Sequence, residues 1–224
     1  MSASSSLNIG IILGSARTNN NNNGIAQWVH HHLETVLSSG AESGFDGKTT
    51  LIPLTTYPLP LGPLYEDLIP QAVRPETDAP SVGGARTFAY PSQRTKDFSH
   101  IIQTLDALVI VTPQYNWSIP GELKNAIDHL FHEWADLPIA TVTYGGRGGD
   151  KVSEALRMII HGIRAKEVSV GKVMVVLPRE SHIVGPERLS ADAELLKQYD
   201  AVLSEELGKL VAAAREKKGS GGHQ

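Results

Sequence analysis

The sequence predicts an α/β protein with a doubly wound, three-layer architecture, in which a central parallel sheet is covered by helices on both faces. Short apolar runs alternate with longer amphipathic segments along the chain, and this alternation produces βαβ units with right-handed crossovers. A chain of 224 residues is also long enough to bury a sizeable core. We therefore expect one domain over residues 1–216, followed by a disordered tail at 217–224, which reads KKGSGGHQ.

Five apolar runs are the predicted strands. The run LDALVIV is nearly continuous, as is typical of a central parallel strand that is buried on both faces. The periodicity of these runs does not determine the order of the strands in the sheet. The expected strands are Leu7–Leu13, Thr49–Leu54, Leu105–Val111, Pro138–Thr143 and Val168–Leu177.

The segments between these runs have the apolar spacing of amphipathic helices. In the first of them, Ile25, Trp28, Val29 and Leu33 fall on one helical face. The last is expected to begin with Ser190 as its N-cap, because a serine side chain accepts a hydrogen bond from the first turn. The expected helices are Gly24–Leu37, Thr95–Thr104, Pro120–Trp134, Lys151–Ile163 and Ser190–Ala214.

Residues 55–95 are the exception to this alternation. The segment is rich in proline and begins TTYPLPLGPLYEDL. Loops of this length without secondary structure are uncommon in compact domains and are usually functional or disordered. We expect an insertion within the domain, between the second strand and the helix at Thr95–Thr104.

Composition narrows the function classes. The net charge of −4 and the pI near 6.1 argue against a nucleic-acid-binding protein. No apolar run is long enough for a membrane span, and the N-terminus lacks the pattern of a secretory signal, so a cytoplasmic protein is expected. The absence of cysteine excludes disulfides, thiolate metal sites and a cysteine nucleophile.

No metal site is expected either. His30–His32 are consecutive residues, which do not converge on one face of a helix. His129, His132 and Glu133 can share a helical face, but we expect that face to be hydrated or to contact another subunit.

Ligands of open α/β sheets bind beyond the carboxyl ends of the strands, so the residues that follow each strand form the candidate site. The first such loop, GSARTNNNNNG at 14–24, combines the Ser15 hydroxyl, the Arg17 guanidinium and the amides of a helix start. All three suit a phosphate. The alternative is a polar surface turn with Arg17 in a salt bridge.

Two further loops carry candidate ligand-binding residues. In TPQYNWSIPGELKNAID at 112–128, Tyr115 and Trp117 stand beside amide side chains that can stack on and bind a flat heteroaromatic ring. The alternative is that both rings are core or interface anchors and that Asn116 caps a turn. In TYGGRGGD at 143–150, four glycines around Arg147 let backbone amides approach a ligand, unless they form only a flexible turn.

Together these loops resemble the NADPH-dependent FMN reductase family, which includes quinone and azo reductases. The resemblance rests on G-S-x-R, P-x-Y-N-x-S-x-P-G-x-L-K-N-A-I-D and Y-G-G-x-G-G after the first, third and fourth strands, and extends from Asn8 to Leu177. It implies a flavodoxin-like fold with a five-stranded parallel sheet in the order 2-1-3-4-5. It also implies FMN as cofactor, NADPH or NADH as hydride donor, and a homodimer or homotetramer, with which exposed rings at Trp117 and Trp134 are compatible.

The family motifs also imply the residues of the site. They assign Ser15 and Arg17, with the amides of Asn22, Asn23 and Gly24, to the FMN phosphate. The isoalloxazine ring is then lined by Pro113, Gln114, Tyr115 and Asn116, and along its other edge by Tyr144, Gly145, Gly146, Arg147 and Gly148. No protein side chain is expected to be catalytic, because the flavin itself performs the hydride chemistry.

The function that follows is an FMN-dependent NAD(P)H oxidoreductase. It is expected to reduce a small quinone-like acceptor, FMN or an azo compound by ping-pong hydride transfer through the flavin. Two alternatives are an electron carrier with the same fold but no NAD(P)H oxidase activity of its own, and a flavin-binding regulatory protein.

Overall fold

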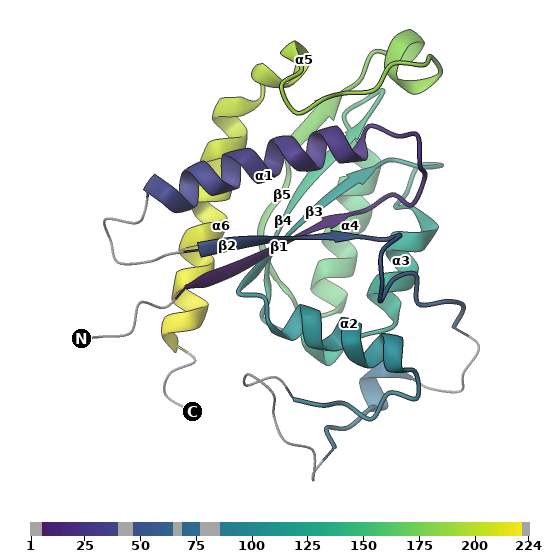
Figure 1. Cartoon of the computed structure of the whole chain (residues 1–224), viewed down its shortest axis with the longest axis vertical. Helices are drawn as coiled ribbons and strands as arrows, with labels where there is room; N and C mark the ends of the chain where they lie inside the picture. Colours follow the sequence, from purple (N-terminus) through teal and green to yellow (C-terminus); the bar gives the residue numbers. More distant parts are fainter. Residues whose placement is uncertain (1–5, 40–46, 65–68, 77–85, 221–224) are drawn as a thin grey trace.

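A parallel five-stranded sheet forms the centre of the computed structural model, which describes residues 6–39, 47–64, 69–76 and 86–220. Its strand order is β2-β1-β3-β4-β5, and every neighbouring pair is parallel. This confirms the predicted fold class and strand order (Figure 1). The strands are β1 Leu7–Leu13, β2 Gly47–Pro53, β3 Ala107–Pro113, β4 Pro138–Gly145 and β5 Lys166–Val176.

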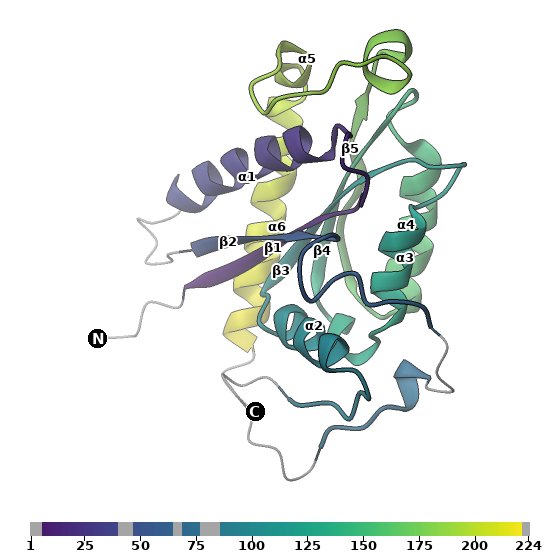
Figure 2. The same ribbon diagram turned by 45° about the vertical axis from the view of Figure 1, so that its right-hand side comes forward.

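Helices cover both faces of the sheet (Figures 1 and 2). One hydrophobic core joins one face to α1 and α6, and a second joins the other face to α2, α3 and α4. The helices are α1 Asn22–Ser39, α2 Gln93–Gln103, α3 Gly121–Asp128, α4 Asp150–Gly162, α5 Glu194–Lys197 and α6 Asp200–Ser220. Three shorter turns are η2 Pro70–Ala72, η3 His132–Trp134 and η4 Arg179–Ile183.

The order of the strands reverses at β1, which pairs with β2 on one side and β3 on the other. Leu13 lies opposite Val111 at the carboxyl ends of β1 and β3, so the loops that follow these strands start side by side. Gly14 permits this, because a Cβ on it would lie 2.7 Å from the Cβ of Thr112. The reversal therefore creates a crevice between the first and second predicted loops.

The prediction of one helix over Pro120–Trp134 is wrong, because α3 ends at Asp128 and the turn η3 follows separately. The Trp134 indole nitrogen donates a hydrogen bond at 3.1 Å to the carbonyl of Ile127, in the last turn of α3. The same ring is 1% exposed and packs edge-on against Phe98. The expectation that Trp134 is exposed is therefore also wrong.

The prediction of one helix over Ser190–Ala214 is wrong as well, since α5 and α6 are separate helices. Tyr199 lies between them, and its hydroxyl accepts a hydrogen bond from the Val176 amide at the end of β5. Ser190 is not an N-cap, because α5 begins at Glu194 and its N-cap position is Ala193. The Ser190 carbonyl accepts a hydrogen bond from the Ala193 amide in the turn before that helix.

The chain also remains helical beyond the expected domain boundary at residue 216. Helix α6 continues to Ser220, so the first four residues of the expected disordered tail are helical. Lys217 is half-buried and Lys218 forms an ion pair with Asp106, which ties the end of α6 to the start of β3. Residues 221–224 lie outside the described residues.

The described parts of the 55–95 segment pack against the sheet rather than away from it. Leu59, Val73, Phe88 and Tyr90 are buried in the core shared with α2, α3 and α4. Residues 65–68 and 77–85 are outside the described ranges. No helix among the described residues is long and apolar enough to cross a bilayer.

The face carrying Glu133 was expected to be hydrated or to contact another subunit, but Glu133 itself is buried within the chain. Glu133 is 7% exposed, and its carboxylate accepts hydrogen bonds from the hydroxyls of Tyr90 and Ser99. The His132 ring stacks on Phe88 at 5.4 Å. Within the described residues, no group of three or more His, Cys, Asp or Glu side chains could hold a metal ion.

Candidate functional site

A cavity of about 280 Å³ opens at the carboxyl ends of the strands, beside the reversal of strand order. Residues from all three predicted loops line it, together with a fourth segment that follows β5. Seven of the fourteen predicted cofactor-binding residues are in the lining. The lining residues are Arg17, Asn19, Asn20, Asn21, Pro113, Gln114, Tyr115, Tyr144, Gly145, Gly146, Leu177, His182, Ile183 and Arg188.

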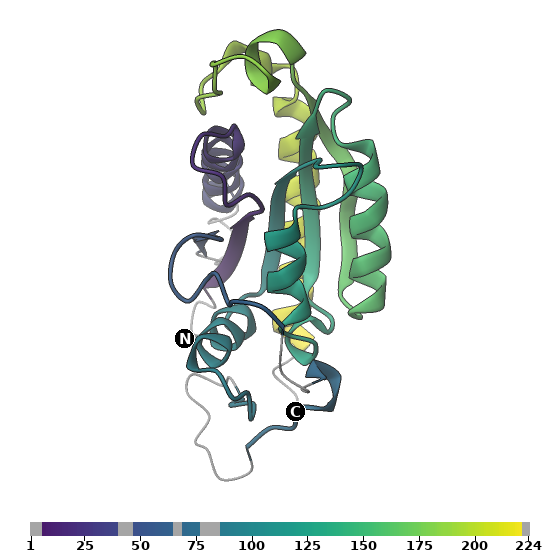
Figure 3. The same cartoon turned by 90° about the vertical axis from the view of Figure 1, so that its right-hand side faces the viewer.

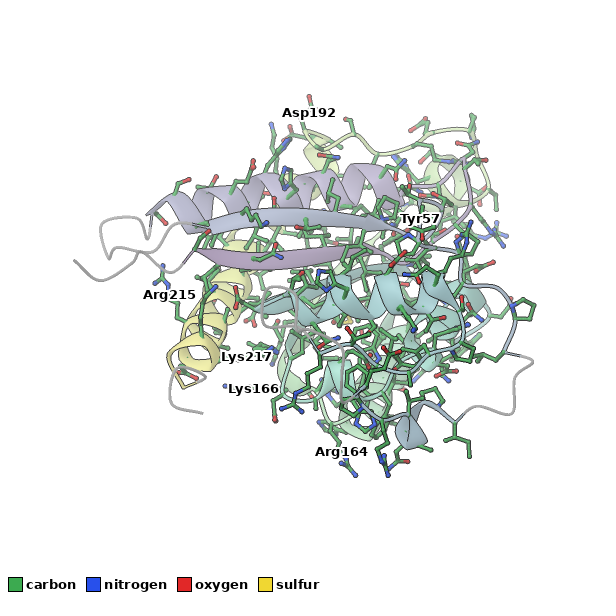
Figure 4. All side chains as sticks on the ribbon, turned by 60° about the horizontal axis from the view of Figure 1, so that its bottom comes forward. Tyr57, Arg164, Lys166, Asp192, Arg215 and Lys217 are labelled. Carbon is green, nitrogen blue, oxygen red and sulfur yellow. The ribbon has the colours of Figure 1, made fainter. Side chains whose placement is uncertain are left out.

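A larger cavity, of about 420 Å³, lies at the opposite end of the sheet. It is lined in part by Ile102, Gln103 and Lys217, next to the start of β3, and Figure 4 labels Lys217 on the last turns of α6. None of the predicted site residues reaches it. Because ligands of open α/β sheets bind at the carboxyl ends of the strands, the smaller cavity is the candidate site.

Ser15, Arg17 and Tyr115 join the first loop to the second. The Ser15 hydroxyl is 7% exposed and lies 2.9 Å from the Tyr115 hydroxyl. The Arg17 guanidinium lies 4.3 Å from the centre of the Tyr115 ring, in a cation–π contact. Arg17 is itself exposed, so its charge stands at the edge of the cavity, supported by the ring beneath it.

The asparagine run has different roles at successive positions. The Asn20 side chain accepts a hydrogen bond from the Asn22 amide at 2.6 Å and donates one to the Arg17 carbonyl, which closes the loop onto the helix start. Asn22 is fully buried and begins α1, two residues before the expected start at Gly24. Asn23 is exposed on the first turn.

Asn22 carries the donor that best indicates an anionic ligand. Its Oδ1 accepts a hydrogen bond from the Tyr144 hydroxyl at 3.0 Å, but its Nδ2 is buried and has no hydrogen-bond partner among the described residues. An unpaired buried donor is costly, and here it adjoins the positive end of the α1 dipole. The donors around the helix start therefore fit a phosphate group.

Burial keeps the Tyr144 phenol protonated. Its side chain is 4% exposed, and desolvation, with a smaller contribution from Tyr115, raises its pKa well above the usual value of 10.0. The phenol therefore stays neutral and donates a hydrogen bond to Asn22 Oδ1. Tyr144 thereby orients the Asn22 amide from the opposite wall of the cavity.

The second loop makes a two-residue turn that exposes its tryptophan. Asn116 and Trp117 have φ of 46° and 65°, and Tyr115 and Ser118 exchange two backbone hydrogen bonds across them. A turn with two left-handed residues favours asparagine. Trp117 is 63% exposed and lies 6.0 Å from the Arg147 guanidinium, so it is not a core residue.

Gln114 has a structural task as well as a place in the cavity wall. Its Oε1 accepts hydrogen bonds from the amides of Lys151 and Val152, at 2.9 and 3.3 Å, and so caps the first turn of α4. Its backbone amide donates to the Tyr144 carbonyl at 3.0 Å. The side-chain oxygen is therefore committed to α4, while the residue still lines the cavity.

The glycines of the third loop divide into two pairs. Gly148 and Gly149 have φ of 70° and 84°, which glycine adopts without strain. Gly145 and Gly146 line the cavity, where the missing side chains leave the backbone bare. Arg147 and Gly148 do not line it, and Arg147 lies exposed beside Trp117 instead.

The segment after β5 was missed by sequence reasoning. It contributes His182, Ile183 and Arg188 to the cavity, and Asn21 hydrogen-bonds to it at the His182 carbonyl and the Leu189 amide. These residues follow the last predicted strand and belong to none of the three motifs. The polar stretch PRESHIVGPERLS offers no periodic signal that would place it against α1.

Comparison with known proteins agrees with this geometry. The family model for NADPH-dependent FMN reductase matches residues 7–177. An NAD(P)H-dependent FMN reductase of Saccharomyces cerevisiae is 35% identical over 175 residues, which cover 77% of this chain and 82% of the relative. Another, of Schizosaccharomyces pombe, is 31% identical over 175 residues, covering 78% of this chain and 76% of the relative.

More distant similarities extend the comparison. A quinone reductase of Escherichia coli is 44% identical over 66 residues, 26% of this chain and 35% of the relative. The flavoenzyme NAD(P)H:(acceptor) oxidoreductase of Paracoccus denitrificans has a solved structure with a TM-score of 0.62 and 17% identity, covering 92% of this chain and 98% of its own. That likeness shows the shared fold. With its family motifs gathered around one cavity, the chain belongs to the NADPH-dependent FMN reductase family.

Proposed function

We propose that this chain binds FMN in the 280 Å³ cavity and uses it to pass a hydride from NADPH or NADH to a quinone-like acceptor. One observation carries the proposal: the three family motifs, which lie far apart in the sequence, line a single cavity at the carboxyl ends of the strands. The chain is accordingly an oxidoreductase of this family, and its relatives include FMN reductases and quinone reductases.

The proposed phosphate subsite is at the start of α1. The unpaired Nδ2 of Asn22 and the backbone amides of Asn23 and Gly24 would donate to phosphate oxygens. The Asn22 backbone amide already donates to the Asn20 side chain, so Asn22 would act through its side chain. The Arg17 guanidinium would add a charge-assisted hydrogen bond. The Ser15 hydroxyl already bonds to Tyr115, and can donate to a phosphate while accepting from that phenol.

The proposed ring subsite lies between the second and third loops. Pro113, Gln114 and Tyr115 would line one side, and Tyr144, Gly145 and Gly146 the other edge. Asn116, Arg147 and Gly148, which the family motifs also assign to the ring, are not in the cavity lining. The bare backbone at Gly145 and Gly146 supports this assignment, since amides at close range stabilise negative charge on an adjacent ring edge. FMN, when bound, supplies the hydride chemistry, so the protein positions the reactants and holds charge.

The proposed kinetic mechanism is ping-pong, because one open ring face would serve the nicotinamide and the acceptor in turn. Quinones are the proposed acceptors, since they are flat enough to stack on that face, and quinone reductases are among the relatives. Initial rates at several fixed quinone concentrations, with NADPH varied, should give parallel double-reciprocal lines. Intersecting lines would contradict the ping-pong order while leaving FMN binding intact.

We also propose a homodimer or homotetramer in the cytoplasm. The support is the large exposed ring of Trp117, beside the cavity, in a position where another subunit could cover it. Light scattering on a size-exclusion column should give a mass of two or four times 24.1 kDa. A mass of one chain at micromolar concentration would contradict the proposal.

A further inference from the structure

One wall of the candidate cavity lies beyond the part of the chain that the family model matches. The match ends at Leu177, whereas His182, Ile183 and Arg188 line the cavity from the segment that follows. In Figure 3 this light-green segment passes above the start of α1. The wall is therefore built from the chain's own continuation after β5.

Asn21 attaches this wall to the first loop. It is 6% exposed, its Nδ2 donates to the His182 carbonyl at 2.8 Å, and its Oδ1 accepts from the Leu189 amide at 2.9 Å. One side chain thus holds two points of the segment that are seven residues apart. Gly24 lets the segment approach, since the Leu189 carbonyl oxygen lies 1.8 Å from where a Cβ would stand.

The attached segment brings a second arginine to the first loop. Arg188 donates from Nε to the Asn19 carbonyl at 3.2 Å, and from Nη1 to the carbonyls of Gly185 and Glu187 at 2.9 and 2.5 Å. These bonds hold the guanidinium at the cavity, whose lining also includes Arg17. The Glu187 carboxylate lies 3.8 Å from the His182 ring.

We infer that Arg188 is a second cation for the phosphate of FMN, and that Asn21 is the residue that positions it. The inference rests on the proposed function. A phosphate monoester carries a charge of about −1.5 to −2 at pH 7, which one guanidinium does not balance. Arg17 from the first loop and Arg188 from the segment after β5 together match it. Arg188 is thus a specificity residue that favours FMN over riboflavin, which has the same ring system and no phosphate.

The inference also separates Asn21 from its neighbours in the asparagine run. Both polar atoms of its side chain are occupied by the segment after β5, so it acts through Arg188 and not by touching phosphate. Asn22, by contrast, has an unpaired buried donor.

Dissociation constants for FMN and riboflavin test the role of Arg188, measured by flavin fluorescence on the FMN-free protein. R188A should raise the FMN constant by about 10- to 100-fold, as expected for one charge-assisted hydrogen bond, and change the riboflavin constant by less than about threefold. The FMN dissociation constant of R188K should lie between those of the wild type and R188A. R179A is the matched control, because Arg179 is exposed, pairs with Glu180 and does not line the cavity.

Hydrogen exchange tests the role of Asn21 without any flavin. In N21A the Leu189 amide should exchange faster than in the wild type, and FMN affinity should fall more than riboflavin affinity. In N23A, the matched control at an exposed neighbour, the Leu189 amide should exchange as in the wild type. Unchanged Leu189 exchange in N21A would overturn the positioning role.

Two results would overturn the role of Arg188, and they differ from failure of the proposed function. One is that the wild type binds FMN and R188A binds it with the same dissociation constant. The other is that R188A loses the same factor of affinity for FMN and for riboflavin, because a purely structural defect would weaken the binding of both ligands. Wild-type protein that takes up neither flavin would instead overturn the proposed function together with the inference.

Discussion

Replacing Gly24 with alanine should force α1 and the segment after β5 apart. The new Cβ would stand 1.8 Å from the Leu189 carbonyl oxygen and 2.6 Å from its carbon. The two groups must therefore separate by about 1.2 Å to reach even 3.0 Å, below which real Cβ contacts essentially never occur. That displacement would also break the 2.9 Å hydrogen bond from the Leu189 amide to Asn21.

The cost of G24A follows from these two effects. Overpacking typically costs about 1–3 kcal/mol, and a lost buried hydrogen bond about 1 kcal/mol. The free energy of unfolding should therefore fall by about 2–4 kcal/mol. For a protein of this length, each kcal/mol lowers Tm by about 2–4 °C, so the melting temperature should fall by roughly 4–16 °C.

Thermal and urea unfolding of the FMN-free protein measure this change. G208A is the matched control, because Gly208 lies within α6 and no atom of the described residues comes within 4 Å of its added Cβ. Alanine in a helix interior is more stable than glycine by about 0.5–1 kcal/mol, so G208A should unfold at or above the wild-type midpoint. A G24A midpoint equal to that of the wild type would refute the packing of Leu189 against α1.

Three further predictions concern single side chains. R17A should weaken FMN binding by about 1.5–3 kcal/mol, the range for a hydrogen bond to a charged group, and an unchanged dissociation constant would remove Arg17 from the site. Y144F should lower the free energy of unfolding by about 1–3 kcal/mol in urea, because Asn22 Oδ1 loses its buried partner; an unaltered midpoint would contradict that bond. Burial opposes ionisation of Glu206, but hydrogen bonds, including one from Lys209, hold its pKa below the usual value. The ionised carboxylate therefore stabilises the fold at any pH above about 4.5, the pKa of Glu206 in the unfolded chain, and this stabilisation is lost as the pH falls through the lower pKa of the folded protein. E206Q should accordingly be less stable than the wild type at pH 7 and equally stable in acid. A difference in urea midpoint that does not shrink as the pH is lowered from 7 into the acid range would contradict this.

The sheet could be predicted from the sequence because its strands are buried on both faces. Residues 107–111 are entirely apolar, and all are buried in the structure. Burial of this kind leaves a continuous apolar run that needs no tertiary information to find. The strand order came from the family resemblance, since apolar runs alone do not specify neighbours.

The helix boundaries were harder to predict, because apolar spacing continues across breaks in the backbone. Trp134 keeps the helical spacing after α3 ends, yet it packs back and hydrogen-bonds the Ile127 carbonyl. Tyr199 interrupts the last predicted helix through a hydrogen bond to Val176 on a distant strand. Both breaks depend on partners that only the folded chain brings together.

The same limit applies to the candidate site. The three motif loops were recognised because each follows a strand, and the structure brings them to one cavity. The wall containing Arg188 has no motif, and its attachment depends on Asn21, which sequence alone cannot tell from its four identical neighbours. A run of five asparagines thus contains residues with different partners, and only the hydrogen bonds separate them.

The most direct test of the central claim is an absorption spectrum. The purified protein is mixed with FMN, desalted, and then treated with NADPH and a quinone in turn without oxygen. The flavin bands should stay with the protein, bleach on addition of NADPH and return on addition of the quinone. Protein that retains no flavin after desalting, or whose flavin bands do not bleach with NADPH or NADH, would contradict the central claim.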